Sequence, residues 1–328
     1  MQHIGRGLAT LVVCVATSAS LHAQDSTELP TPLLVTAGIE VDSSRTAQVA
    51  LPNPGCPLTS GQLKAVRAGV GTAFVGANAY LYQYFKKAWW SGERSDHFFF
   101  HADWDQWFRD QDKFGHAYGG YHLTRVGYAA LREACVSDRK AIIWAWVYAA
   151  AFQLQIEIFD GHFEKYGFSY ADMIANTLGQ GYAVMQAVRP GWRVIKPTFS
   201  YHKTQALKNT ENGTIAKPSE LRPSLDYSGQ TYWLSADVEE MLPKDAKPYW
   251  PSYVRFSVGH SITDWIEPNT GEVQRAQRKI LLSLDFDPDK LPGDWPLWRT
   301  IKRTLSYYRF PAPAIELTPK LKFDPWYR

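Results

Sequence analysis

Cysteine is scarce in this chain, with three among 328 residues, which excludes a small domain held together mainly by disulfides. Net charge is also small, since 35 Lys and Arg against 32 Asp and Glu give a formal +3. There is no basic stripe interleaved with aromatic residues, so the sequence predicts no nucleic-acid partner. With 45% hydrophobic and 20% charged residues, the chain must build a core, yet it is too polar to lie in a membrane throughout.

Common catalytic motifs are missing as well. The sequence has no G-x-S-x-G elbow, no H-E-x-x-H, no Walker loop and no G-x-G-x-x-G after a strand. These absences exclude the usual serine hydrolase, zinc-protease and nucleotide-binding signatures. His162, His202 and His260 are each isolated in the sequence, so we assign none of them to a site.

The N-terminus has the pattern of a secretory signal peptide. Arg6 is followed by an apolar run over residues 8–19 and by the small-residue exit Leu21-His22-Ala23, which predicts cleavage after Ala23. Cys14 does not follow the small residue that a lipoprotein signal needs, so we expect no lipidation. The sequence therefore predicts an exported protein of the periplasm or the outer-membrane-associated cell envelope.

Export would affect both the number of cysteines and their oxidation state. Only Cys56 and Cys135 remain in the mature chain, in an oxidising compartment. They are either two unrelated thiols or one disulfide, and we expect the disulfide.

Composition and apolar periodicity change along the chain, and these changes predict its domains. Residues 1–23 are the signal peptide and 24–58 an extended arm; 59–189 carry four apolar stretches of helical length, at 63–85, 112–134, 141–159 and 170–188. Residues 190–230 read as a linker or loop, and 231–328 as a β-rich C-terminal region. The predicted fold class is mainly α: a four-helix up-and-down bundle followed by a small C-terminal β-containing region.

The helical stretches leave the relation to a membrane open. Residues 141–159 are long enough to cross a bilayer, but Gln153, Gln155 and Glu157 lie in their second half. A soluble bundle, membrane-spanning helices and a bundle lying partly in a membrane surface all fit this pattern.

Polar residues suited to chemistry are concentrated in three short motifs. These are D-K-F-G-H at 112–116, E-I-F-D-G-H at 157–162 and G-F-S-Y-A-D-M-I-A-N-T-L-G at 167–179. Spacings of three or four residues put side chains on one helix face, and they pair Asp112 with His116, Glu157 with Asp160, and Asp172 with Asn176. Gly179 allows close contact between helices.

Bundle connectivity brings these motifs together. In an up-and-down bundle, the start of the second helix, the end of the third and the start of the fourth lie at one end. The candidate catalytic residues are therefore Asp112, Lys113, His116, Glu157, Asp160, Asp172 and Asn176. Burying several carboxylates together is costly unless they bind a cation, share a proton or meet a positive partner, which favours a functional site. Cys56 and Cys135 would meet at the opposite end.

Each of these residues also has a purely structural interpretation. Ser169 and Asp172 fit a capping box, S-x-x-D, and Asp112 can cap a second helix. The other structural roles are a core His116 bonded to Glu157, a buried amide at Asn176, and Lys113 reaching solvent or pairing with one carboxylate.

The three motifs together resemble the YfiM-like family of predicted periplasmic lipoproteins, over about residues 107–190. More distantly, D-K-x-x-H, an intervening Glu and D-x-x-x-N-x-x-G are similar to VanZ-like membrane proteins linked to glycopeptide resistance. The resemblance implies an envelope location and points to the candidate residues Asp112, Lys113, His116, Glu157, Asp172 and Asn176. It implies no activity, because the YfiM-like family has no settled one. The chain departs from the family by lacking a lipobox cysteine, so lipid anchoring is not carried over.

Two functions follow from these observations. The first is an envelope enzyme acting on a lipid or glycan precursor, with His116 as general base or metal ligand, the carboxylates as ligands or acid, and a divalent metal as a possible cofactor. The second is a non-catalytic envelope protein, in which the cluster is a structural network and the protein binds a lipid or protein partner. In both cases the expected partner is a membrane or envelope lipid.

Residues 89–108 are unusually aromatic for a solvated loop. They are expected either to pack as a cap over the bundle or to form a lid that brings an amphipathic substrate or a membrane surface to the polar cluster.

Overall fold

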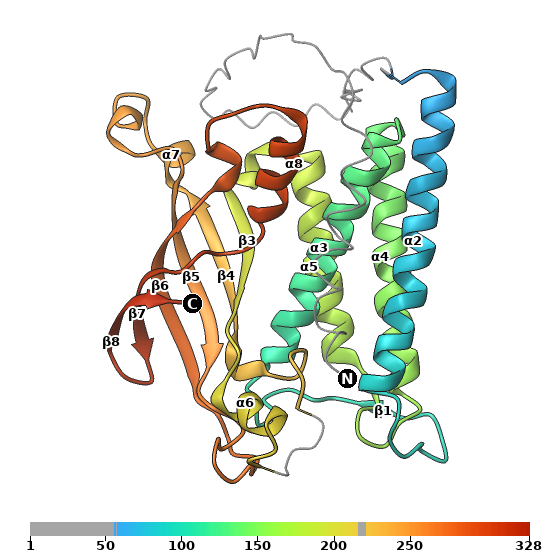
Figure 1. Ribbon diagram of the computed structural model, residues 1–328, viewed down its shortest axis with the longest axis vertical. Helices are drawn as coiled ribbons and strands as arrows, with labels where there is room; N and C mark the ends of the chain where they lie inside the picture. The colour runs from blue at the N-terminus through green and yellow to red at the C-terminus, as the bar shows by residue number, and fades with distance from the viewer. Residues whose placement is uncertain (1–55, 57, 216–220) are drawn as a thin grey trace, which may run out of the picture.

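The computed structural model describes residues 56, 58–215 and 221–328 and pairs a layer of long helices with a sheet (Figure 1). The predicted signal peptide, its cleavage after Ala23 and nearly all of the arm at 24–58 lie outside the described residues.

The long helices lie where the apolar periodicity predicts them. They are α2 Ser60–Ala88, α3 Gln111–Glu133, α4 Asp138–Asp160 and α5 Tyr170–Val188. At the start of α2, the Thr59 side chain and Gln62 form a reciprocal capping box. Helix α3 packs against both α4 and α5. Gly179 sits directly against the backbone carbonyl of Ala117, so the absence of a side chain there lets α5 approach α3 closely, as expected.

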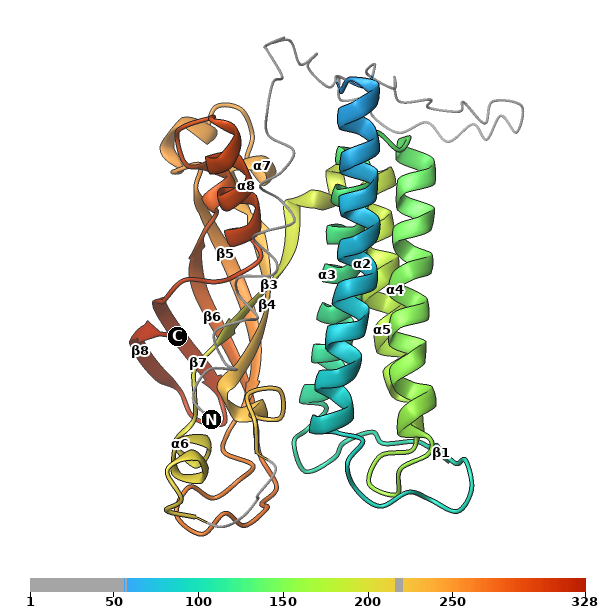
Figure 2. The ribbon, with the colours of Figure 1, turned by 45° about the vertical axis from the view of Figure 1, so that its right-hand side comes forward.

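The predicted mainly α fold, a four-helix up-and-down bundle with a small β-containing region, is wrong. Six strands form one antiparallel sheet in chain order: β3 Ile195–Tyr201, β4 Gln230–Asp237, β5 Val254–Ile262, β6 Arg278–Phe286, β7 Ala312–Thr318 and β8 Lys322–Tyr327. The sheet begins inside residues 190–230, expected to be a linker or loop, where α6 Gln205–Glu211 also lies. The described chain is an α+β protein whose sheet stands beside the helices (Figure 2).

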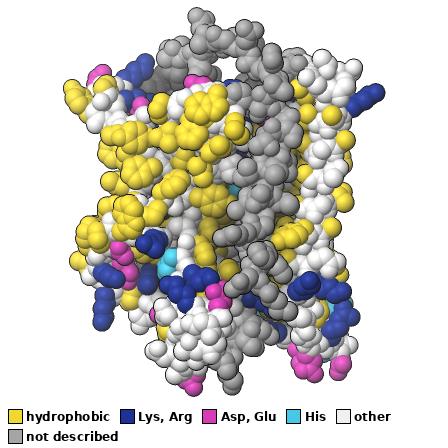
Figure 3. Space-filling view, in the orientation of Figure 1, with side chains coloured by type: hydrophobic (Ala, Val, Ile, Leu, Met, Phe, Trp, Pro, Cys, Tyr) yellow, Lys and Arg dark blue, Asp and Glu magenta, His cyan; other side chains and the backbone are white. Residues whose placement is uncertain are grey.

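The sheet was underestimated because its polarity is unusual. One face buries hydroxyl groups, among them Ser235, which lies 2.9 Å from Thr198 Oγ1 and 2.8 Å from Ser257 Oγ. The opposite face leaves apolar side chains such as Phe256 and Leu284 exposed. Hydrophobic side chains accordingly gather on the surface over the sheet (Figure 3). Strands with serine and threonine on the buried face lack the apolar alternation that identifies a core strand.

Helix α3 joins the two layers and is thereby fixed in place. Gln111 is buried; its amide nitrogen donates to the carbonyl of Gln230 on β4 (2.8 Å) and its amide oxygen lies 2.8 Å from His260 Nδ1 on β5. The Phe114 ring stacks on the His260 ring with centroids 4.0 Å apart. The first turn of α3, which carries the D-K-F-G-H motif, is therefore held by the sheet.

At the far end of the helices, Cys56 and Cys135 form a disulfide with Cα atoms 5.6 Å apart, as predicted. It ties the residues before α2 to the end of α3.

Helix α4 is long and apolar enough to cross a membrane, and it is the one such helix in the described part of the chain. Its polar residues Gln153 and Glu157 are buried, while Trp144 and Ile158 are exposed. Whether the helices span a membrane, lie on one or form a soluble layer stays a prediction, as does the division into domains.

Candidate functional site

The polar motifs of α3, α4 and α5 meet at one end of the helical layer. Helices α3 and α5 begin there and α4 ends there, beside the short strand β1 Phe100–His101 (Figure 1). β1 pairs in parallel with β2 Phe168–Ser169, which brings the chain after β1 next to the start of α5.

The ammonium group of Lys113 joins three carboxylates. Its Nζ lies 2.8 Å from Asp112 Oδ2 and 3.0 Å from Asp172 Oδ1, and it also contacts Asp103 Oδ2. Burial alone would lower the pKa of Lys113, but the charges of Asp112 and Asp172 outweigh it and the pKa rises. The expectation that Lys113 reaches solvent or pairs with one carboxylate is therefore wrong.

Asp103 is a member of the cluster that sequence reasoning missed. It accepts a hydrogen bond from Ser169 Oγ at 2.5 Å in addition to its contact with Lys113. Burial opposes ionisation of Asp103, yet the hydrogen bonds from Lys113 and Ser169 prevail and lower its pKa. It lies in an irregular segment, where no periodicity relates it to the helical motifs.

The start of α5 is capped as predicted, but only half of the capping box is internal to the helix. Ser169 Oγ accepts the Asp172 backbone N–H at 3.0 Å. The Ser169 backbone N–H instead donates a hydrogen bond to Glu157 Oε2 of α4, at 3.2 Å. The Asp172 carboxylate is thus free to face Lys113 and His116. Asp112 is not a cap, since Asp110 occupies the N-cap position of α3.

A chain of amide groups fixes the orientation of His116. The Gln153 amide nitrogen donates to the His116 backbone carbonyl at 3.0 Å and also contacts Asn176 Oδ1, while its oxygen accepts from Gln180 at 2.7 Å. Asn176 Oδ1 must then be an acceptor, and His116 Nδ1, 3.1 Å away, must be the donor. This leaves Nε2 facing Asp172 Oδ1 at 3.7 Å.

Glu157 is the most deeply buried acid of the cluster. Its side chain is 1% exposed, its Oε1 lies 3.7 Å from His116 Nδ1, and this oxygen has no hydrogen-bond partner among the described residues. Burial raises the pKa of Glu157 to about 8 and that of Asp112 to about 6. Burial would lower the pKa of His116, but the surrounding carboxylates, Asp172 first, raise it overall.

The cluster carries more negative than positive groups. Asp103, Asp112, Glu157 and Asp172 supply four carboxyl groups against one ammonium, Lys113, and one imidazole, His116. With all four carboxyl groups ionised, even a protonated His116 would leave an excess of two negative charges, and Glu157, whose pKa is raised to about 8, relieves part of it by holding a proton at neutral pH. Burial is the largest cause of the raised pKa values of Glu157 and Asp112, and the charge of Asp172 adds to it. Protons or a bound cation can relieve the excess charge.

Asp160 makes no hydrogen bond or ion pair to the cluster among the described residues, although its charge interacts with those of Glu157, His116 and Asp172. It lies at the end of α4 and accepts a hydrogen bond from the Trp90 indole at 2.6 Å. Burial raises the pKa of Asp160 to about 7. The other six predicted site residues do converge.

Two groups of residues have ligand atoms within 4.8 Å of one another, close enough to share a metal ion: His116, Glu157 and Asp172, and Asp103, Asp112 and Asp172. The second group already surrounds the Lys113 ammonium. In the first group, Glu157 Oε1 has no hydrogen bond among the described residues, while Asp172 Oδ1 also lies 3.0 Å from Lys113 Nζ.

The aromatic segment at 89–108 packs in part as a cap, and whether it also acts as a lid stays a prediction. Trp90 is buried with Phe152, Ile156 and Phe163 in a core cluster, as a cap would be. Trp104 and Trp107, on either side of Asp105, are more than half exposed.

The fold and the cluster define an α+β protein with a buried Asp, His, Glu and Asn site at one end of its helices. Residues 105–188, which include all seven predicted site residues, match the family described as Predicted periplasmic lipoprotein (DUF2279). This is an exported protein of the periplasm or envelope, as predicted. No curated protein and no solved structure matches the chain. The finer YfiM-like name and the VanZ-like similarity stay predictions.

Proposed function

We propose that this protein is an envelope enzyme that binds a divalent cation through His116, Glu157 and Asp172 and acts on an envelope lipid or glycan precursor. The observation that carries the proposal is the orientation of His116. Its Nδ1 proton is committed to Asn176 Oδ1, and its Nε2 faces a buried carboxylate. Metal-binding histidines in proteins are held in this manner, with the second ring nitrogen donating to an oxygen.

The donor set suits a transition-metal ion. One imidazole nitrogen and two carboxylate oxygens are ligands of zinc and related ions, and they leave coordination positions open for water or substrate. Ligands at about 2.1 Å from one ion lie at most about 4.2 Å apart. The three ligand atoms all lie within 4.8 Å of one another, so a small rotation of the side chains would bring them around one ion. The cation would also offset the excess negative charge of the cluster.

When bound, the cation would polarise a substrate oxygen or lower the pKa of a bound water. The residues of this chain have separate roles in the proposal. Asn176 and Gln153 hold the imidazole ring, and Lys113 holds the carboxylates of Asp112 and Asp172 in place. Asp112, with its pKa raised to about 6 by burial, can exchange a proton near neutral pH.

An amphipathic substrate is supported by the surface around the site. Exposed Trp104 directly follows Asp103 in the chain, and Trp107 is exposed three residues later. Tryptophan combines an apolar body with a polar tip and favours the lipid–water interface. Replacing Trp104 and Trp107 by Ala should weaken binding to phosphatidylethanolamine–phosphatidylglycerol vesicles. Trp90→Ala should instead lower the thermal midpoint, because Trp90 is in the core.

A second candidate function, a structural lock without catalysis, is favoured by Lys113. One buried ammonium that contacts Asp103, Asp112 and Asp172 ties α3, α5 and the chain after β1 together without any metal. The two candidates differ in whether His116 holds an ion.

Metal content tests the proposal. Protein isolated from the envelope without chelators should carry about one divalent ion per chain, as should the control His162→Ala, which changes an exposed histidine outside the cluster. His116→Ala should lose the ion. Two results together would favour the structural lock. The wild-type protein would stay metal-free after incubation with zinc or manganese, and His116→Ala would lower its stability without any change in metal content.

A further inference from the structure

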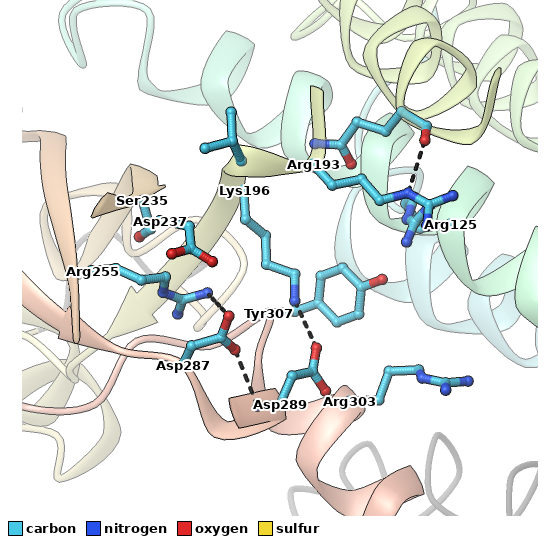
Figure 4. Close-up of a pocket in the computed structure, with 12 residues that line it drawn as sticks. Arg125, Arg193, Lys196, Ser235, Asp237, Arg255, Asp287, Asp289, Arg303 and Tyr307 are labelled. Carbon is cyan, nitrogen blue, oxygen red and sulfur yellow. Dashed lines mark hydrogen bonds and ion pairs between the residues drawn. The ribbon is translucent and has the colours of Figure 1, made fainter. Parts of the chain in front are cut away.

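A second polar site lies between the sheet and the other end of the helices. It is a pocket of about 270 Å³ lined by residues of α3, α5, the sheet and the segment around α8 Pro296–Leu305 (Figure 4). Arg125 lines it from α3, nine residues after His116, or about 14 Å along the helix. The pocket is therefore separate from the metal-binding cluster.

Positive charge predominates in this pocket. Its walls carry five cationic side chains, Arg125, Arg193, Lys196, Arg255 and Arg303, and three carboxylates, Asp237, Asp287 and Asp289, a formal balance of +2. Each carboxylate already has a cation: Asp289 lies 3.0 Å from Lys196, Asp287 3.6 Å from Arg255, and Asp237 2.6 Å from Lys290. Arg125, Arg193 and Arg303 form no ion pair with any of the described residues.

The arginines also have donors to spare. Arg255 is 1% exposed, and only its Nη2 makes hydrogen bonds, to Asp285 Oδ2 at 2.7 Å and to the Phe286 carbonyl at 3.0 Å. Its Nε has no hydrogen-bond partner among the described residues, and its Nη1 has only the ion pair with Asp287 at 3.6 Å. Nε and Nη1 of Arg125 also have no hydrogen-bond partner there. Buried guanidinium donors without acceptors are costly, so these arginines favour binding of a group that supplies acceptor oxygens.

The backbone at the pocket is well fixed. Gln186 of α5 donates to the carbonyls of Trp192 at 3.1 Å and Ile195 at 2.7 Å, and Arg193 Nε donates back to the Gln186 carbonyl at 3.0 Å. Lys196 Nζ lies 5.0 Å from the centroid of the Tyr307 ring. The turn from α5 into β3 thus presents its basic side chains in a preformed arrangement.

We propose that this pocket binds a phosphate group. Planar guanidinium forks match the oxygens of phosphate in pairs, and three arginines without ion pairs suit a doubly charged anion. The volume fits a headgroup rather than a whole lipid or a drug-sized ligand. The phosphate belongs either to a small soluble ester or to the head of an envelope lipid. The inference does not depend on the proposed metal site.

Calorimetric titration of the whole protein with inorganic phosphate, at constant ionic strength, tests the site. Saturable binding should weaken about tenfold in Arg125→Gln and fall in Arg193→Gln and Arg303→Gln. The side chain of Arg303 is exposed and makes no hydrogen bond or ion pair with the described residues, so Arg303→Gln separates loss of binding from loss of structure. Arg299→Gln, an exposed arginine outside the pocket on the same helix as Arg303, should bind as the wild type does.

Vesicles distinguish the two sources of phosphate. Flotation with phosphatidic acid vesicles that depends on Arg125 and Arg193, against none with phosphatidylcholine, identifies a lipid headgroup. Phosphate binding without such flotation identifies a soluble ester. Phosphate that fails to saturate, or that binds equally to Arg193→Gln, Arg303→Gln and Arg299→Gln, overturns the proposal.

Discussion

His116 on α3 donates its Nδ1 proton to Oδ1 of Asn176 on α5 across 3.1 Å, and the orientation of this bond is determined by the protein itself. Gln153 needs its amide nitrogen for the His116 carbonyl, so it can only present a donor to Asn176. One hydrogen-bond chain through three helices therefore sets which ring nitrogen of His116 is available to a ligand.

Removing the Asn176 acceptor should weaken metal binding without removing a ligand. Asn176→Ala is expected to lower the affinity about 10–100-fold, because the imidazole loses the oxygen that orients it. Asn176→Asp keeps an acceptor and should recover most of that loss. Competition with a chromophoric chelator measures both variants, and equal affinities for wild type and Asn176→Ala would show that the bond plays no part in binding.

Lys113 should be the most sensitive position for stability. Lys113→Met leaves three carboxylates without their shared cation and should lower the free energy of unfolding by roughly 3–5 kcal/mol. Lys140→Met, at an exposed position on α4, should change it by less than about 0.5 kcal/mol. Urea titration of both variants followed by circular dichroism is the measurement. A cost at Lys113 no greater than at Lys140 would mean that the carboxylates are already protonated.

Asp160 should make the metal-free protein less stable as the pH rises. Its folded pKa of about 7 exceeds the ordinary carboxyl value, so its contribution is fully present below about pH 4 and is lost as the pH passes 7. Asp160→Asn should reduce the fall in unfolding free energy between pH 4 and pH 8 by roughly 1–3 kcal/mol. The exposed Asp245→Asn serves as control. Denaturant midpoints across this range that fall equally in all three proteins would contradict the burial of Asp160.

Close packing of α3 on α5 predicts opposite effects at two neighbouring glycines. A Cβ at Gly179 would overlap the Ala117 carbonyl, whereas a Cβ at Gly181 would meet nothing within 4 Å. Gly179→Ala should therefore lower the free energy of unfolding by at least about 2 kcal/mol. Gly181→Ala should raise it by up to about 1 kcal/mol. Thermal unfolding of the two variants decides, and similar midpoints would rule out the close contact.

The sequence allowed the helices and most of the site to be predicted for a common reason. The helices have uninterrupted apolar periodicity, and a spacing of four residues places Asp112 with His116 and Asp172 with Asn176 whatever surrounds them. Short connections between successive helices then bring their ends together. Whether those residues are catalytic stays a prediction.

The sheet and Asp103 could not be predicted in this way. Thr198 and Ser235 point into the buried side of the sheet, so the strands resemble polar loop sequence, and β3 was assigned to a linker. Asp103 reaches the cluster because β1 pairs with β2. Each of these strands is only two residues long, which is too short for the alternating pattern that identifies a strand in a sequence. Asp160 has suitable spacing, but its side chain accepts a hydrogen bond from the Trp90 indole and interacts with the cluster only through its charge.

Anomalous X-ray diffraction from crystals of chelator-free protein tests the central claim most directly. The account predicts one anomalous peak at about 2.0–2.3 Å from His116 Nε2 and from one oxygen each of Glu157 and Asp172, with Asn176 Oδ1 still accepting from Nδ1. A metal peak only at the surface, or none beside His116 after soaking with zinc or manganese, would contradict it.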